Sequence, residues 1–159
     1  MQNEVKETTP RISIPIWKTI DIGTFKDTTA LYEALMEKVD RVVIKSFSNS
    51  SMRRGTVNLV KIRLIDLGIH ERILYRDVVQ IAKDFGLQKC IDEIILQLRL
   101  QFGEISPEEN GPLIAMDTFY RDSVENVYKV DHRGLARRPV TGSYPPYIKT
   151  SDEIIFKIG

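Results

Sequence analysis

The segment Val127-Tyr-Lys-Val-Asp-His-Arg-Gly-Leu-Ala-Arg-Arg-Pro-Val140 decides the fold of this 159-residue chain. It holds two β-prone runs, 127–130 and 135–140, with the turn-forming residues His-Arg-Gly between them. Residues 113–120 and 154–158 are further short β-prone runs, and turn chemistry again lies between neighbouring runs. Short strands joined by turns indicate a largely antiparallel sheet in the last third of the chain.

Helical patterns occupy the earlier two-thirds. The clearest is 75–85, where apolar residues recur at helical spacing and a glycine follows at the left-handed cap position. A second helix is expected after Asp27 and Thr28, either of which is able to cap it. The apolar positions of the two helices are Val78, Ile81, Ala82 and Phe85, and Leu31, Leu35 and Val39.

Three other segments are read as follows. Residues 12–22 alternate like a half-buried strand, although Pro15 makes it an edge strand or a broken one. Residues 56–67 are predicted to be a buried strand that ends at Gly68. Residues 90–102 fit both patterns, so we predict a helix to about Gln97 and a strand through Phe102.

These elements predict one α+β domain over residues 12–159. Two or three helices would pack on a mainly antiparallel sheet built largely from the C-terminal third. Residues 1–11 are polar and are expected to form a flexible tail.

Composition limits the functional classes. Lys and Arg number 23 against 22 for Asp and Glu, a net charge of +1, which excludes a binder that relies on bulk positive charge. The single cysteine excludes an intrachain disulfide framework and a multi-cysteine zinc site. Without an apolar run of about 18 residues or an apolar leader, the expectation is a cytoplasmic protein that does not enter a membrane.

Several short motifs occur in order between residues 57 and 119. They are Leu67-Gly-Ile69, Asp77-Val-Val-Gln-Ile-Ala82, Gly86-Leu87, Cys90, Leu98-Arg-Leu-Gln101 and Leu113-Ile-Ala-Met116. This order resembles a family of small uncharacterised proteins from bacteria and their mobile elements. The chain departs from the family pattern at Ile69, where the family has Phe, and at Ile91, where it has Pro. The resemblance implies a shared fold and no established activity.

Residues 75–98 approximate the spacing of a helix-turn-helix, with Gly86 at the turn. The second helix would read Ile91-Asp-Glu-Ile-Ile-Leu-Gln97, whose carboxylates and aliphatics are poor readers of a DNA groove. Two packed core helices are the favoured interpretation, and DNA binding is a lesser alternative.

Cys90 is a second candidate. A position beside Lys89 and before a helix would lower its pKa and favour the thiolate. A cysteine nucleophile also needs a base, and His70 and His132 are not its neighbours in sequence. A small buried hydrophobe is the favoured interpretation.

The strongest local signal is the basic loop at 131–139. Arg133, Arg137 and Arg138 would form an anion cradle, with His132 available for proton transfer near neutral pH. Tyr144 and Tyr147 follow and would be able to stack on a base. A second basic spot, Arg53-Arg54, would extend this face if the fold brings it near.

We therefore expect a small non-catalytic binding module that engages a protein partner or an anionic small ligand through this loop. The alternative from another class is a toxin-like nuclease, with His132 as acid–base and the arginines on phosphate. Glycine-rich phosphate loops, metal-binding His-Glu helices and nucleophile elbows are missing from the sequence, so neither metal nor cofactor is expected.

Overall fold

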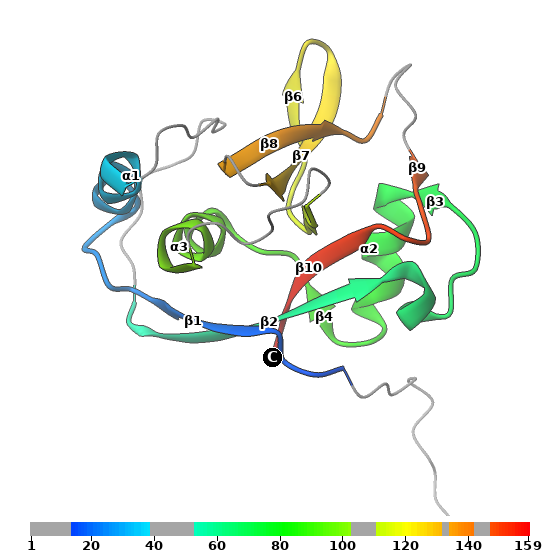
Figure 1. Ribbon diagram of the computed structural model, residues 1–159, viewed down its shortest axis with the longest axis horizontal. Coiled ribbons are helices and arrows are strands. Elements are labelled where there is room, and N and C mark those ends of the chain that lie inside the picture. Colours follow the sequence, from blue (N-terminus) through cyan, green and yellow to red (C-terminus); the bar gives the residue numbers. More distant parts are fainter. Residues whose placement is uncertain (1–13, 39–52, 103–110, 132–133, 142–146) are drawn as a thin grey trace, which may run out of the picture.

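A large, mainly antiparallel sheet forms the centre of the molecule (Figure 1). The computed structural model describes residues 14–38, 53–102, 111–131, 134–141 and 147–159. Eight strands in this part of the chain form the sheet, in the order β1-β2-β10-β5-β7-β6, with β4 on β10 and β8 on β7. They are β1 Lys18–Ile22, β2 Gly55–Arg63, β4 Leu87–Gln88, β5 Leu113–Ile114, β6 Phe119–Arg121, β7 Val124–Asp131, β8 Gly134–Pro139 and β10 Glu153–Ile158.

The strand pairing confirms the expected fold class. Every pair is antiparallel except β5 with β10. The hairpin predicted from 127–140 forms as β7 and β8, with Val130 opposite Leu135. The run 113–120 divides into β5 and β6, and β9 Tyr147–Ile148 pairs with β3 Ile73–Leu74 in a separate ribbon. The predicted tail 1–11 lies outside the described residues.

Within the described residues, three α-helices pack around the sheet: α1 Thr28–Lys38, α2 Tyr75–Lys83 and α3 Asp92–Phe102. The backbone N–H of Ala30 donates to the Asp27 carboxylate at 2.9 Å, which confirms Asp27 as a cap of α1. Leu31 and Leu35 are fully buried against Leu96 of α3. In Figure 1, α3 lies between α1 and the strands β1 and β2. None of the helices among the described residues has the length and apolar character that crossing a membrane requires.

The predicted strand at the end of residues 90–102 is wrong, because α3 continues to Phe102. The helix is apolar on two sides, since it is packed between two layers. Ile95 and Leu98 face the main core, whereas Leu96 and Leu100 pack in the smaller cluster against α1. A helix buried on both sides produces the alternation that suggested a strand.

Two other boundaries differ from expectation. The strand predicted over 56–67 ends at Arg63, and a 3-10 turn, η1 Leu64–Leu67, follows it. The Asp66 carboxylate accepts the Arg63 backbone N–H at 2.8 Å, and Gly68 ends the turn with a φ of 78°. The strand predicted over 12–22 begins at Lys18, beyond Pro15. Helix α2 stops at Lys83, and Gly86 takes the expected left-handed conformation.

The polar side of α3 covers the outer edge of β1. Gln101 donates to the Asp21 carbonyl at 2.7 Å and accepts the Asp21 N–H at 3.1 Å, as a neighbouring strand would. One turn earlier Gln97 donates to the Thr24 hydroxyl, and Glu93 accepts the Gly23 N–H. Gln101 and Glu93 thus satisfy backbone groups of Asp21 and Gly23, and Gln97 between them holds the Thr24 side chain.

Candidate functional site

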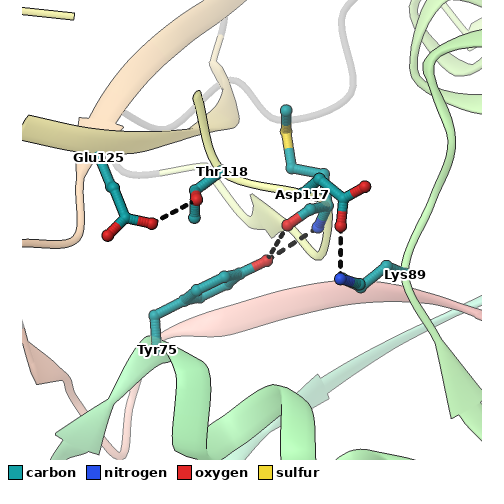
Figure 2. A network of polar contacts seen from close by, with 6 residues as sticks. Tyr75, Lys89, Asp117, Thr118 and Glu125 are labelled. Carbon is teal, nitrogen blue, oxygen red and sulfur yellow. Dashed lines mark hydrogen bonds and ion pairs between the residues drawn. The ribbon is translucent and has the colours of Figure 1, made fainter. Parts of the chain in front are cut away.

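A tyrosine at the start of α2 fixes the segment that follows β5. The Tyr75 hydroxyl donates to the Met116 carbonyl at 2.7 Å and accepts the Met116 N–H at 2.8 Å. Figure 2 shows the phenol reaching from α2 to this segment, beside Asp117 and Thr118. Tyr75 is 5% exposed, and Met116 is buried. The hydroxyl thus takes the place of a strand neighbour and holds residues 116–118 against α2.

A groove lies between α2, residues 87–92 and this fixed segment. A cavity of about 480 Å³ adjoins a second hollow of about 360 Å³, and the two share several walls. We call the combined feature the α2 groove. The shared residues are Val79, Lys83, Lys89, Met116 and Asp117.

The inner surface of the α2 groove is apolar. Leu87, Cys90 and Met116 are buried there, and Val79 packs partly buried against the core. Ile91 stands at the rim, 61% exposed. An exposed isoleucine beside a hollow with apolar walls is typical of a surface that takes an apolar group of a partner.

The rim of the α2 groove is charged. The Lys89 ammonium pairs with the Asp117 carboxylate, and the Thr118 hydroxyl donates to Glu125 (Figure 2). Arg76 and Lys83 project from α2 along the opposite side, and within the described residues neither makes an ion pair. One wall therefore carries carboxylates that already have partners, and the other carries two available cations.

The two buried protonatable groups of the groove, Cys90 and Tyr75, are held in their neutral forms. Burial raises the pKa of the Cys90 thiol to about 12, and its Sγ lies 3.9 Å from the Ile155 carbonyl. Loss of water outweighs the lowering by Lys157, and Lys89, which the sequence suggested, is not among the groups that shift the pKa of this thiol. Burial also raises the pKa of the Tyr75 hydroxyl well above its ordinary value. Neither side chain is a nucleophile at neutral pH.

Of the residues predicted for the basic loop, the structure brings Arg138 and Tyr147 together and directs Arg137 elsewhere. Arg137 reaches Asp122, with 3.5 Å between Nη1 and Oδ2. Arg138 donates to the Tyr147 carbonyl at 3.1 Å and to the carbonyl of Pro139. Neighbouring strand residues point to opposite faces of a sheet, so these two arginines act at separate places. His132, Arg133 and Tyr144 lie outside the described residues.

The ring of Tyr147 already has a cation above it. The guanidinium carbon of Arg72 lies 4.7 Å from the ring centroid, within the range of a cation–π contact. With the Arg138 bond to its carbonyl, Tyr147 joins β8, β9 and the loop before β3. A base that stacked on the face of the ring that Arg72 covers would have to displace Arg72.

Arg53 and Arg54 lie away from the predicted loop. They precede β2, whose start is near the lower left of Figure 1, whereas β8 is at the top centre. Both are exposed, and their backbone packs against Gly23, where a side chain would overlap it. The described residues therefore do not form the single basic face that the sequence allowed.

The helix-turn-helix interpretation meets two structural obstacles. Between α2 and α3 the chain enters the sheet as β4, which pairs with β10. Every residue of α3 from Ile94 to Arg99 is buried, so the second helix has no exposed face there for a DNA groove. Packed core helices describe this segment.

Sequence reasoning missed the α2 groove. The pattern of residues 75–85 predicts a helix and indicates nothing of a groove beside it. Met116 appeared only within a family-like motif, and nothing in the sequence links it to Tyr75, 41 residues earlier. Lys89 and Asp117 are likewise 28 residues apart. Comparisons of this chain with protein-family models, curated proteins and solved structures find no match, so the functional argument rests on its own residues.

Proposed function

We propose that this chain is a non-catalytic binding module that takes an apolar side chain of a partner protein in the α2 groove. The observation that carries the proposal is the groove itself, a cavity of about 480 Å³ with buried apolar walls and a polar rim. Binding sites of this kind combine an apolar interior with a few polar groups that orient the ligand.

The chemistry of the lining residues favours binding over catalysis. General acid–base work needs a group whose pKa lies near the operating pH, and burial moves the pKa values of Tyr75 and Cys90 far above it. The Lys89 ammonium and the Asp117 carboxylate are joined in an ion pair. The groove is well suited to hold a partner, because the hydrogen bonds of Tyr75 keep the wall at residues 116–118 in a fixed position.

A matched pair of substitutions tests the proposal. Ile91 lines the groove and is 61% exposed, whereas Ile65 is 49% exposed on η1 and is not part of the groove lining. Replacing either isoleucine with aspartate adds the same charge at an exposed site, so stability should change little in both. Only Ile91→Asp places that charge at the mouth of the groove.

The probe is a displayed library of random dodecapeptides, selected on the immobilised wild-type chain. Enriched peptides are synthesised with a fluorophore and titrated by anisotropy. Ile91→Asp should weaken binding at least tenfold, and Ile65→Asp should leave the Kd within about twofold, because exposed sites outside an interface are close to neutral. Failure to enrich any peptide, or equal binding to both variants, would refute the proposal.

A further inference from the structure

Helix α2 presents two cations to one side of the groove. Arg76 and Lys83 are exposed, line the groove, and have no ion pair among the described residues. Seven residues separate them, which is two helical turns and a rise of about 10 Å. Val79 lies between them on the same wall and faces the apolar interior.

The carboxylates of the facing wall do not neutralise this pair. Asp117 is engaged by Lys89, and Glu125 accepts the Thr118 hydroxyl. A ligand in the groove therefore meets two positive charges on α2 and, on the facing wall, one ion pair and the single charged carboxylate of Glu125. Complementarity requires negative charge toward α2 and an apolar group between the two cations.

We infer that the partner segment is an acidic peptide, with an apolar side chain inserted beside Val79 and carboxylates on Arg76 and Lys83. This inference rests on the proposed function and adds the chemical class of its ligand. The guanidinium of Arg76 is able to bind one carboxylate with two parallel hydrogen bonds, and Lys83 provides a point charge for another. Side chains on one face of an extended peptide recur every second residue, so two carboxylates four residues apart span about 13 Å, close to the rise of about 10 Å between Arg76 and Lys83 along α2.

An acidic peptide fits the groove better than a nucleic acid does. A phosphate backbone carries continuous negative charge, and it would meet the Glu125 carboxylate, which has no ion pair among the described residues, across the groove from α2. A peptide is able to direct acidic residues to one wall only. The apolar interior also suits an aliphatic or aromatic side chain, whereas bases bind mainly by stacking on aromatic rings.

The same dodecapeptide library tests the inference when it is selected in parallel on the wild type and on the double variant R76E/K83E. Sequences from the wild type should be enriched in Asp and Glu on both sides of an apolar residue. The variant should bind these acidic peptides at least tenfold more weakly and should itself select Lys and Arg at the same positions. Raising NaCl from 50 to 500 mM should weaken the wild-type complex and should not weaken what remains in the variant.

Two controls keep the result interpretable. The variant R121E/K149E makes the same charge change at exposed sites outside the groove lining and should keep the wild-type Kd within about twofold. The neutral variant R76Q/K83Q should show an intermediate loss of affinity for the acidic peptides. With its fold checked by circular dichroism, it replaces R76E/K83E in the test if that variant does not fold.

The outcomes separate this inference from the proposed function. Peptides that depend on Ile91 but show no acidic bias, and bind R76E/K83E as tightly as the wild type, would overturn the inference and leave the groove as a binding site. An absence of any peptide that depends on Ile91 would refute the proposed function itself. A 20-nucleotide poly-dT or poly-U that displaces the peptides and binds more tightly would overturn the assignment to a peptide.

Discussion

The bond between Tyr75 and Met116 gives the sharpest test of how the groove is built. Tyr75→Phe removes one oxygen atom and keeps the ring, so it leaves the apolar packing in place. It also leaves two buried backbone groups of Met116, the N–H and the C=O, without their partner at 2.8 and 2.7 Å. An orphaned buried polar group costs about 1–3 kcal/mol, so we expect a loss of about 3 kcal/mol in the free energy of unfolding.

The assay is equilibrium unfolding in urea, followed by the fluorescence of the single tryptophan, Trp17, and by circular dichroism. Tyr120→Phe is the control, because Tyr120 is 73% exposed and should change stability by less than about 0.5 kcal/mol. For a chain of this size the loss at Tyr75 corresponds to a fall in Tm of about 6–12 °C. Hydrogen exchange should also show faster exchange of the Met116 amide. A change within about 0.5 kcal/mol of wild type at an unchanged denaturant slope would refute the reasoning.

Three further predictions concern the core, a tight approach and the sheet edge. Burial raises the pKa of Cys90 from 9.0 to about 12, so the folded chain keeps a proton that the unfolded chain releases. This contribution to stability is fully present below pH 9 and falls by about 1.4 kcal/mol per pH unit above pH 9. Cys90→Ser should remove this dependence on pH in urea titrations from pH 8 to 10.5. An unchanged dependence in the variant would contradict the prediction. Gly23→Ala should lower the free energy of unfolding by about 3 kcal/mol or more, since its Cβ would overlap the backbone before β2. Gly68 also has a positive φ but has open space around it, so Gly68→Ala should cost only about 1 kcal/mol. Equal losses of stability in thermal melts would show that the approach to Gly23 is not tight. Gln101→Leu should cost about 1 kcal/mol and speed hydrogen exchange at the Asp21 amide, and a protected Asp21 amide would show that α3 does not cover this edge.

Local patterns predicted those elements whose signal lies within a few neighbouring residues. The hairpin 127–140, helix α2 and the Asp27 cap each carry their own signal within a few residues, because turn chemistry, helical periodicity and capping are local properties. Helix α3 failed the same test because it is buried on two sides, and its alternating leucines serve two different layers. Strand and helix periods are hard to separate when both faces are apolar.

The groove could not be read from the sequence for a different reason. Its geometry depends on side chains distant in sequence, such as Tyr75 and Met116, that meet only in the folded chain. Conversely, Arg137 and Arg138 are adjacent in sequence, and the strand directs them to different partners. The sequence therefore suggested a cluster of neighbouring arginines that the β-strand separates. It did not indicate the contact between Tyr75 and Met116, which only the tertiary fold brings together.

A balanced net charge is compatible with a site that selects by charge, because many of the charges act on near neighbours. Lys89 pairs with Asp117, and Arg63 approaches Asp66 at 3.9 Å. Such pairs leave little field beyond a Debye length of about 10 Å at 0.1 M salt, so a distant partner meets a nearly neutral surface. Arg76 and Lys83 have no such neighbour in the described part of the chain, and their positions on α2 differ by a rise of about 10 Å beside an apolar hollow. Their electrostatic effect is consequently short in range. It would change the rate at which a bound segment dissociates from the groove more than the rate at which a partner associates.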